Sequence, residues 1–126
     1  MEGAIRVLLV EDNDVYRDAL EFLLDRYEDV EVVGGVAMGG AARDACLELG
    51  ADVVVVDYRL PDIDGSEVAA ELRERCSETA VVFLSASAGP DEVAAAQSSG
   101  VALVGKDEGV DALVDAIRAA AGRMRA

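Results

Sequence analysis

The sequence predicts an α/β fold, a three-layer (βα)5 domain whose doubly wound parallel sheet has the strand order 2-1-3-4-5. Five apolar runs alternate along the chain with five segments of helical periodicity, which is the pattern of such a domain. The runs are continuous rather than alternating, as expected for strands that helices cover on both faces. With 126 residues the chain can build one compact core but not two, so we expect a single domain over residues 1–126.

The five predicted strands are the apolar runs themselves. They cover residues 5–10 (IRVLLV), 30–36 (VEVVGGV), 53–56 (VVVV), 80–84 (AVVFL) and 101–104 (VALV). The third run consists of valines alone and is followed by a carboxylate, Asp57. An ionised aspartate at the end of so buried a strand is costly unless something pairs with it, and this is the first indication of a site.

Amphipathic segments between the runs predict the helices. They cover residues 14–27, 40–49, 66–76, 91–99 and 110–124. Four of them show an apolar stripe that we expect to face the sheet. In chain order the stripes are Val15, Ala19, Phe22 and Leu23; Ala42, Ala45, Cys46 and Leu49; Val68, Ala69, Leu72 and Cys76; and Val110, Leu113, Val114, Ile117, Ala121 and Met124. The two cysteines are predicted to be small core residues rather than a disulfide.

The segment 91–99 differs from the other predicted helices because Val93 is its only large apolar residue. A helix with so little apolar area to bury should be the loosest element of the fold. An ordinary short surface helix is an equally good interpretation. Pro61 and Pro90 are both predicted to lie in loops that follow strands.

The chain carries 26 acidic and 11 basic residues, a net charge of −15. Such a surface repels phosphates, so we expect no direct nucleic acid binding by this domain. No apolar run approaches the ~20 residues of a membrane span, and the first residues do not resemble a secretion signal. We therefore expect no membrane association and a cytoplasmic location. The sequence has no histidine, which excludes histidine-based metal sites, catalytic triads and phosphohistidine chemistry within this chain.

Polar residues follow four of the five predicted strands. Glu11 and Asp12 come after the first strand, Asp57 after the third, Ser85 after the fourth and Lys106 shortly after the fifth. The carboxyl ends of parallel strands meet at one edge of a doubly wound sheet, where ligands bind. In the predicted strand order the first two acids lie beside Asp57. The sequence therefore predicts one polar site at this edge.

Three carboxylates so close together cannot all stay charged unaided. Two unit charges ~4 Å apart repel by roughly 4 kcal/mol at an effective dielectric constant of about 20. Lys106 supplies one positive charge, and an oxygen-only ligand set favours Mg²⁺. An aspartate beside Mg²⁺ and a lysine is suited to phosphoryl transfer, with Asp57 as the nucleophile and Glu11 and Asp12 holding the ion.

Other short polar residues have a simpler interpretation. Asp62 and Asp64 stand next to Pro61 in a predicted turn, so we interpret them as turn residues rather than as metal ligands. Asn13 or Asp14 is expected to cap the first helix.

Four stretches of the sequence resemble the receiver domain of two-component response regulators. They are LLVEDN (8–13), VVVVDYRLPDIDG (53–65), VVFLSAS (81–87) and VGKD (104–107), in the order and spacing of that family. VEVVGGV at the second strand and the pair Lys106-Asp107 most resemble the NarL/LuxR-type regulators. The resemblance covers essentially the whole chain. It implies the flavodoxin-like, CheY-like fold and a phosphoacceptor signalling domain that catalyses only its own phosphoryl transfer and dephosphorylation.

The resemblance assigns roles to the predicted site. Asp57 is similar to the aspartate that accepts a phosphoryl group from the phosphohistidine of a sensor histidine kinase. Lys106 resembles the lysine that pairs with that group. Ser85 matches the serine or threonine that swings to hydrogen-bond it, and Ala86 the small residue that leaves access to it. The implied partners are a histidine kinase and, in a homodimer, a second copy of the chain.

The resemblance also implies the metal ligands. Asp12 and Asp57 match the Mg²⁺ ligands of the family, Glu11 acts partly through water, and the backbone carbonyl of Arg59 completes the set. Arg59 and Ser87 take two positions that vary in the family and tune dephosphorylation. A long Arg59 side chain is expected to shield the acyl phosphate from water and so to prolong its lifetime.

Leu103 is the one clear departure, because the family usually has there a tyrosine or phenylalanine that turns inward on activation. It favours one alternative, a phosphorylation-independent receiver that acts as a protein-interaction module. A phosphatase of the haloacid-dehalogenase type is the other alternative, but it needs a second aspartate where this chain has Arg59, and a cap domain. NarL-like receivers normally precede a DNA-binding domain, so the chain is either a stand-alone regulator or part of a longer one.

Overall fold

The computed structural model describes residues 3–87 and 89–125, with side chains as far as residue 123. The strands are β1 (Ile5–Val10), β2 (Val30–Val36), β3 (Val53–Asp57), β4 (Ala80–Ser85) and β5 (Ala102–Gly105). The helices are α1 (Asp14–Leu24), α2 (Ala42–Leu49), α3 (Gly65–Arg75), α4 (Pro90–Ser99) and α5 (Val110–Arg125). Short 3-10 turns precede α2 and α5, at Gly39–Ala41 and Lys106–Glu108.

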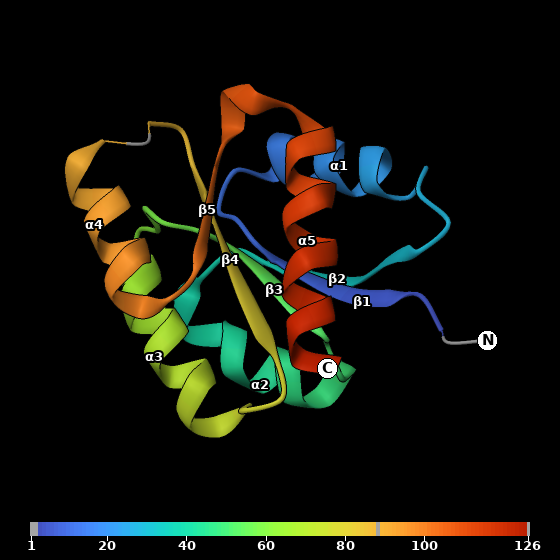
Figure 1. Cartoon of the computed structure of the whole chain (residues 1–126), viewed down its shortest axis with the longest axis horizontal. Coiled ribbons are helices and arrows are strands. Elements are labelled where there is room, and N and C mark those ends of the chain that lie inside the picture. Colours follow the sequence, from blue (N-terminus) through green and yellow to red (C-terminus); the bar gives the residue numbers. More distant parts are fainter. Residues whose placement is uncertain (1–2, 88, 126) are drawn as a thin grey trace.

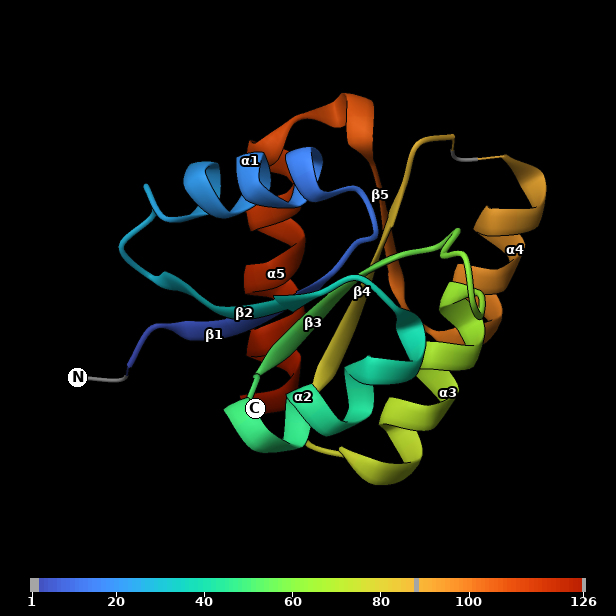
Figure 2. The ribbon, with the colours of Figure 1, turned by 180° about the vertical axis from the view of Figure 1, so that it is seen from behind.

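The strands form one parallel sheet in the order β2-β1-β3-β4-β5, which confirms the predicted topology. All residues of the central strand β3 are buried. Val53 and Val55 pack on the side of α1 and α5, whereas Val54 and Val56 pack on the side of α2, α3 and α4. Figures 1 and 2 show these two layers of helices on opposite faces of the sheet. Because both faces are covered, the strand has no polar side and its sequence is apolar throughout.

The predicted buried face of α1 is wrong. All four residues of that stripe are exposed: Val15, Ala19, Phe22 and Leu23. Val15 and Phe22 are even 80% and 67% exposed. Leu20 and Leu24 are buried in their place and join the core beneath α5. The helix carries two overlapping apolar stripes, and its packing against β2 and α5 buries the stripe of Leu20 and Leu24. The helix also ends at Leu24, before the predicted end at residue 27.

The predicted inner faces of α2, α3 and α5 are confirmed. The residues buried there as predicted are Ala42, Cys46, Val68, Ala69, Leu72, Cys76, Leu113, Val114, Ile117 and Ala121, and those partly buried are Ala45, Leu49 and Val110. Met124 lies outside the side chains that the structure describes. Both cysteines are free, and burial together with the neighbouring Cys46 thiol raises the pKa of Cys76 to about 11. None of the helices in the described ranges is long and apolar enough to cross a membrane.

α4 begins at Pro90, which therefore occupies the first helical position rather than the loop predicted for it. Proline suits this position because its missing N–H would have no partner inside the helix. Of the α4 residues, all of which the structure describes, Glu92 and Ala96 alone are buried, and Val93 is 36% exposed. The helix thus has as little apolar contact as its sequence predicts, and its mobility stays a prediction.

Short polar side chains hold the ends of helices and the loop after β3. Asn13 accepts a hydrogen bond from a backbone N–H in the first turn of α1, and Asp64 does the same for α3. Asp62 accepts from the N–H groups of Gly40 and Gly39, and these bonds hold the pKa of Asp62 below its usual range. The interpretation of Asp62 and Asp64 as structural residues is consistent with these contacts.

Candidate functional site

Three carboxylates lie together at the carboxyl edge of the sheet. Asp57 is the last residue of β3, and Glu11 and Asp12 follow the adjacent strand β1 directly. One carboxylate oxygen of each residue lies within 4.8 Å of the other two. Glu11 and Asp57 are buried and Asp12 is exposed, so the cluster is closed on the inside and open to solvent on the outside.

Glu11 is held by the backbone and leaves one oxygen without a donor. Its N–H donates to the carbonyl of Val36 at 3.0 Å, and its Oε2 accepts from the N–H of Asn13 at 3.0 Å. Its Oε1 is buried and has no hydrogen-bond partner among the described residues, although Nζ of Lys106 forms an ion pair with it at 2.9 Å. A buried carboxylate oxygen without an aligned donor is costly, so this atom is suited to a cation.

Lys106 bridges two of the acids. Its Nζ lies 3.1 Å from Oδ2 of Asp57 and 2.9 Å from Oε1 of Glu11, and 4.4 Å from the centre of the Tyr16 ring. Burial lowers the pKa of Lys106, but the contacts with the two carboxylates outweigh burial, so this pKa lies above its ordinary value. The lysine is therefore charged and offsets part of the negative charge. Burial also raises the pKa of Tyr16, whose hydroxyl stays neutral.

The loop after β3 returns to Asp57. The N–H of Arg59 donates to Oδ1 of Asp57 at 3.1 Å, so both oxygens of this carboxylate have a partner. The Arg59 side chain, 74% exposed, extends to α4, where its Nε donates to Oε2 of Glu92 at 2.8 Å. The expected shielding of an acyl phosphate by Arg59 stays a prediction.

Ser85, at the end of β4, is hydrogen-bonded toward α4. Its hydroxyl donates to Oε1 of Glu92, lies 2.7 Å from the carbonyl of Ser87, and accepts from the N–H of Ser87 at 3.1 Å. Glu92 is only 2% exposed. Burial raises the pKa of Glu92, but hydrogen bonds from Ser85 and Arg59 outweigh burial, so the pKa lies below its usual range and the carboxylate is ionised.

Two residues of this site, Glu92 and Tyr16, were not predicted from the sequence. Glu92 stands four residues before the buried Ala96, so both lie on the inner face of α4. A charged residue on that face was a usable signal, but the scarcity of apolar residues in the segment hid the face itself. Tyr16 stands four residues before the buried Leu20 and was missed because the wrong stripe of α1 was chosen.

The acidic cluster can hold a hard divalent cation. Its three carboxylates offer oxygen atoms only, which suits Mg²⁺. The observation that tests this fit is the buried Oε1 of Glu11, which has no aligned hydrogen bond among the described residues and is paired there with the charged Nζ of Lys106. A cation at the open side of the cluster would satisfy the set.

Comparison with known proteins decides the family. The model of the response regulator receiver domain family matches residues 7–118. The chain belongs to this family. It is 34% identical over 116 residues to the response regulator protein VraR of Staphylococcus epidermidis, covering 91% of this chain and 56% of VraR. It is 36% identical over 115 residues to the uncharacterized transcriptional regulatory protein YvfU of Bacillus subtilis, covering 90% of this chain and 58% of YvfU. The receiver domain thus spans little more than half the length of these relatives.

Solved structures agree with the predicted branch of the family. The receiver domain superposes on that of the putative response regulator NarL from Mycobacterium tuberculosis with a TM-score of 0.83, at 30% identity, covering 93% of this chain and 98% of the other. For a LuxR-family response regulator from Aurantimonas the TM-score is 0.88, at 26% identity, covering 95% and 86%. The resemblance to NarL/LuxR-type regulators is confirmed.

The remaining predicted residues of the receiver domain lie in the loop after β4 and in β5. Ala86 and Ser87 are exposed in the loop after β4. Leu103 is partly buried in β5, pairs in register with Phe83 and packs against the core beneath α2, α3 and α4. In this structure position 103 therefore contributes to the core, where the family usually has an aromatic residue.

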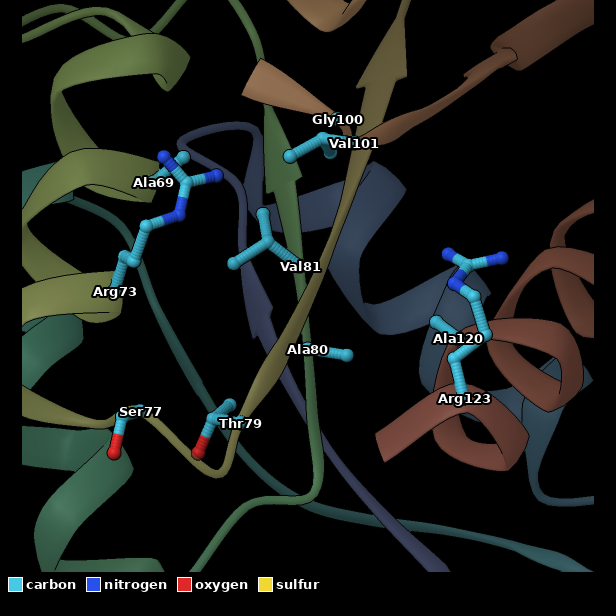
Figure 3. Close-up of a pocket in the computed structure, with 10 residues that line it drawn as sticks. All are labelled: Ala69, Arg73, Ser77, Thr79, Ala80, Val81, Gly100, Val101, Ala120 and Arg123. Carbon is cyan, nitrogen blue, oxygen red and sulfur yellow. The ribbon is translucent and has the colours of Figure 1, made fainter. Parts of the chain in front are cut away.

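A pocket at the opposite edge of the sheet is separate from this site. It has a volume of about 180 Å³ and lies beside the starts of β4 and β5 (Figure 3). Arg73 lines it from α3 and donates to the carbonyl of Ser99 at 2.5 Å, and Arg123 lines it from α5. Figure 3 shows the two arginines on opposite sides of β4. The pocket therefore lacks the converging polar groups found around Asp57.

Proposed function

We propose that this receiver domain accepts a phosphoryl group on Asp57 from the phosphohistidine of a sensor histidine kinase, in a reaction that depends on Mg²⁺. The observation that carries the proposal is the convergence of a buried Asp57, a charged Lys106 and two further carboxylates at one sheet edge. Membership in the receiver family supports the same role.

The proposed transfer needs a nucleophile and nearby positive charge. One carboxylate oxygen of Asp57 forms a bond to phosphorus while the phosphorus–nitrogen bond of the phosphohistidine breaks. The imidazole leaves with the electron pair and is neutral after taking up one proton. Lys106, 3.1 Å from Oδ2, is placed to offset the charge of the phosphoryl oxygens, and the N–H of Arg59 orients the carboxylate.

We propose that Glu11, Asp12, Asp57 and the backbone carbonyl of Arg59 hold the Mg²⁺. Bound there, the ion would neutralise part of the charge of the carboxylates and of the incoming phosphoryl group. The close approach of the three carboxylates supports this ligand set, and so does the buried Oε1 of Glu11, which is already paired with a cation, Nζ of Lys106.

Further residues are proposed to respond to the phosphoryl group. The hydroxyl of Ser85 turns to donate a hydrogen bond to it, and the small, exposed Ala86 leaves access to it. Arg59 and Ser87 tune the lifetime of the phosphorylated form. Leu103 provides no aromatic ring to turn inward, so the response must reach the surface through other groups.

The test is incubation with a small phosphodonor such as acetyl phosphate and Mg²⁺, followed by mass spectrometry of the intact chain. We expect one phosphoryl adduct in the wild type, none in Asp57→Asn, and strong suppression by a chelator. Asp115→Asn, which removes an exposed acid of α5, is the matched control and should keep the adduct. An adduct that persisted in Asp57→Asn or was indifferent to the chelator would contradict the proposal.

The same experiment separates the two alternatives. A wild-type chain that formed no adduct would favour the phosphorylation-independent interaction module. Steady release of phosphate from a phosphomonoester would favour a phosphatase, although Arg59 stands where that chemistry needs a second aspartate.

We also propose that the output lies in another part of a longer regulator, with a role in transcription regulation. Two of the relatives, YvfU and LiaR of Bacillus subtilis, are transcriptional regulatory proteins, and the chain spans little more than half of each. A C-terminal DNA-binding domain, a homodimer and a cytoplasmic location complete the proposal. This domain itself would not bind nucleic acid, since its net charge is −15.

A further inference from the structure

Glu92 is a buried carboxylate that the proposed chemistry does not use. It is 2% exposed and stands in the first turn of α4. Each of its oxygens has one side-chain donor: Oε1 accepts from the hydroxyl of Ser85, and Oε2 from Nε of Arg59 at 2.8 Å. The backbone N–H of Gly89 is a third, weaker donor. A buried charge is tolerated only while such donors are present, so the position of Glu92 depends mainly on the two side chains.

The two residues that supply these donors lie at the strand ends around the proposed phosphoacceptor. The backbone N–H of Arg59 donates to Oδ1 of Asp57 at 3.1 Å. Leu84, which precedes Ser85, pairs in register with Asp57 across β3 and β4. One carboxylate on α4 therefore holds the side chains of two residues that lie at the ends of β3 and β4, the strand pair that carries Asp57.

We propose that Glu92 is a positioning residue that keeps Ser85 and Arg59 directed toward α4, and that phosphorylation of Asp57 draws both donors away and releases the first turn of α4. The inference rests on the proposed function and adds a regulation of the same site. A phosphoryl group carries up to about two negative charges and three strong acceptor oxygens, so it competes with a single carboxylate for a hydroxyl and a guanidinium.

The loss of both side-chain donors leaves the buried charge of Glu92 with the backbone N–H of Gly89 as its remaining donor among the described residues. A buried charge with so few donors is strongly destabilising. An outward movement of α4 exposes the carboxylate to water and removes this cost. The movement costs little apolar burial, because Ala96 is the one other buried residue of α4, every residue of which the structure describes. Phosphorylation and the position of α4 are thereby coupled through Glu92. This coupling needs no aromatic residue at position 103, where the chain has Leu103.

The first test is amide hydrogen exchange of α4 in the unphosphorylated chain. Glu92→Gln keeps the size of the side chain and an oxygen for Ser85, but it removes the charge and turns an amide N–H₂ toward Arg59. We expect α4 amides to exchange about 5-fold faster or more, the lower end of the usual coupling between two sites. Asp91→Asn, which neutralises the exposed neighbouring acid of the same turn, should leave them unchanged. Equal exchange in Glu92→Gln and wild type would overturn the inference.

The second test is the rate of adduct formation from acetyl phosphate and Mg²⁺. In Glu92→Gln the two donors are already free, so we expect phosphorylation about 5-fold faster and a smaller further change in α4 exchange on phosphorylation. A purely structural role of Glu92 would not speed phosphorylation. Arg59→Ala is the second variant if Glu92→Gln does not fold, because the Arg59 side chain is exposed and its removal weakens the same anchor.

The outcomes distinguish this inference from the function on which it rests. Adduct formation at one rate in wild type and Glu92→Gln, with unchanged α4 exchange, would overturn the role of Glu92 and leave the phosphoacceptor role of Asp57 standing. If the wild type formed no adduct, both the proposed function and the proposed movement of Ser85 and Arg59 would be contradicted.

Discussion

α4 and α5 both contact the edge strand β5, but they are attached to the sheet in different ways (Figure 1). α5 buries the apolar side chains of Leu113, Val114, Ile117, Ala120 and Ala121. α4 buries Ala96 and the carboxylate of Glu92, and at its other end the carbonyl of Ser99 accepts a hydrogen bond from Arg73 of α3. One helix is held by apolar packing and the other mainly by polar contacts.

The difference separates a fixed element from one that can respond to charge. Apolar packing has no electrostatic component that a new charge at Asp57 could cancel. The contacts of Glu92 with Ser85 and Arg59 are electrostatic, and Arg59 also binds Asp57 through its backbone N–H. We therefore expect α5 to stay in place as the support of the sheet while α4 carries the response.

The largest expected effect is on α5. Ile117→Ala leaves a cavity at a fully buried position and should lower the free energy of unfolding by about 2–5 kcal/mol. Val93→Ala, the matched change on α4, should stay within about 0.5 kcal/mol, because Val93 is 36% exposed. Urea denaturation monitored by circular dichroism measures both. Similar losses of stability in the two variants would contradict the claim that apolar packing holds α5 but not α4.

A smaller effect is expected at the far end of α4. Arg73→Ala removes the donor to the carbonyl of Ser99, so local opening of α4 should become easier by up to about 1 kcal/mol. Amide exchange of α4 and α5 in one sample measures this, and α5 should not change. Arg75→Ala is the control, since Arg75 lies on the same helix but pairs only with its exposed neighbour Glu74 among the described residues. Faster exchange in both helices would show that α4 has no separate attachment.

The smallest expected effect is a pH dependence of the stability that the ion pair between Arg118 of α5 and Asp29 contributes. Arg118 donates two hydrogen bonds to Asp29, at 2.7 and 3.0 Å, and these hold the pKa of Asp29 below its usual range. The stability that Asp29 contributes is therefore present above its unfolded pKa and lost as the pH falls through the lower, folded pKa.

Thermal unfolding of the wild type and Asp29→Asn across acidic pH measures this contribution. The wild type should be slightly more stable near neutral pH, the difference should vanish in acid, and salt should reduce it, because both side chains are about half exposed. A large difference that persisted in acid would mean that α5 depends on polar contacts after all.

The fold and most of the candidate site could be predicted from the sequence because both follow from local signals. Uninterrupted apolar runs mark strands that are covered on both faces. The parallel sheet then brings their carboxyl ends together, so residues far apart in the chain meet. Glu11, Asp12, Asp57 and Lys106 could be grouped in this way, from the ends of three strands.

The face of α1 could not be predicted, because periodicity specifies a buried stripe only when a helix has one. Val15 and Phe22 form one candidate stripe and Leu20 and Leu24 another, and the packing of α1 against β2 and α5 buries the leucines. The number of apolar positions alone favoured the wrong stripe.

The sequence by itself determined the buried runs and the polar residues at the strand ends, since each is encoded in a short stretch. Only the tertiary structure decided which acid of α4 is buried and what it contacts. Arg59 and Glu92 are separated by 33 residues, and nothing in either stretch specifies the other as its partner. Their contact exists because β3 and α4 meet at the same edge of the folded sheet.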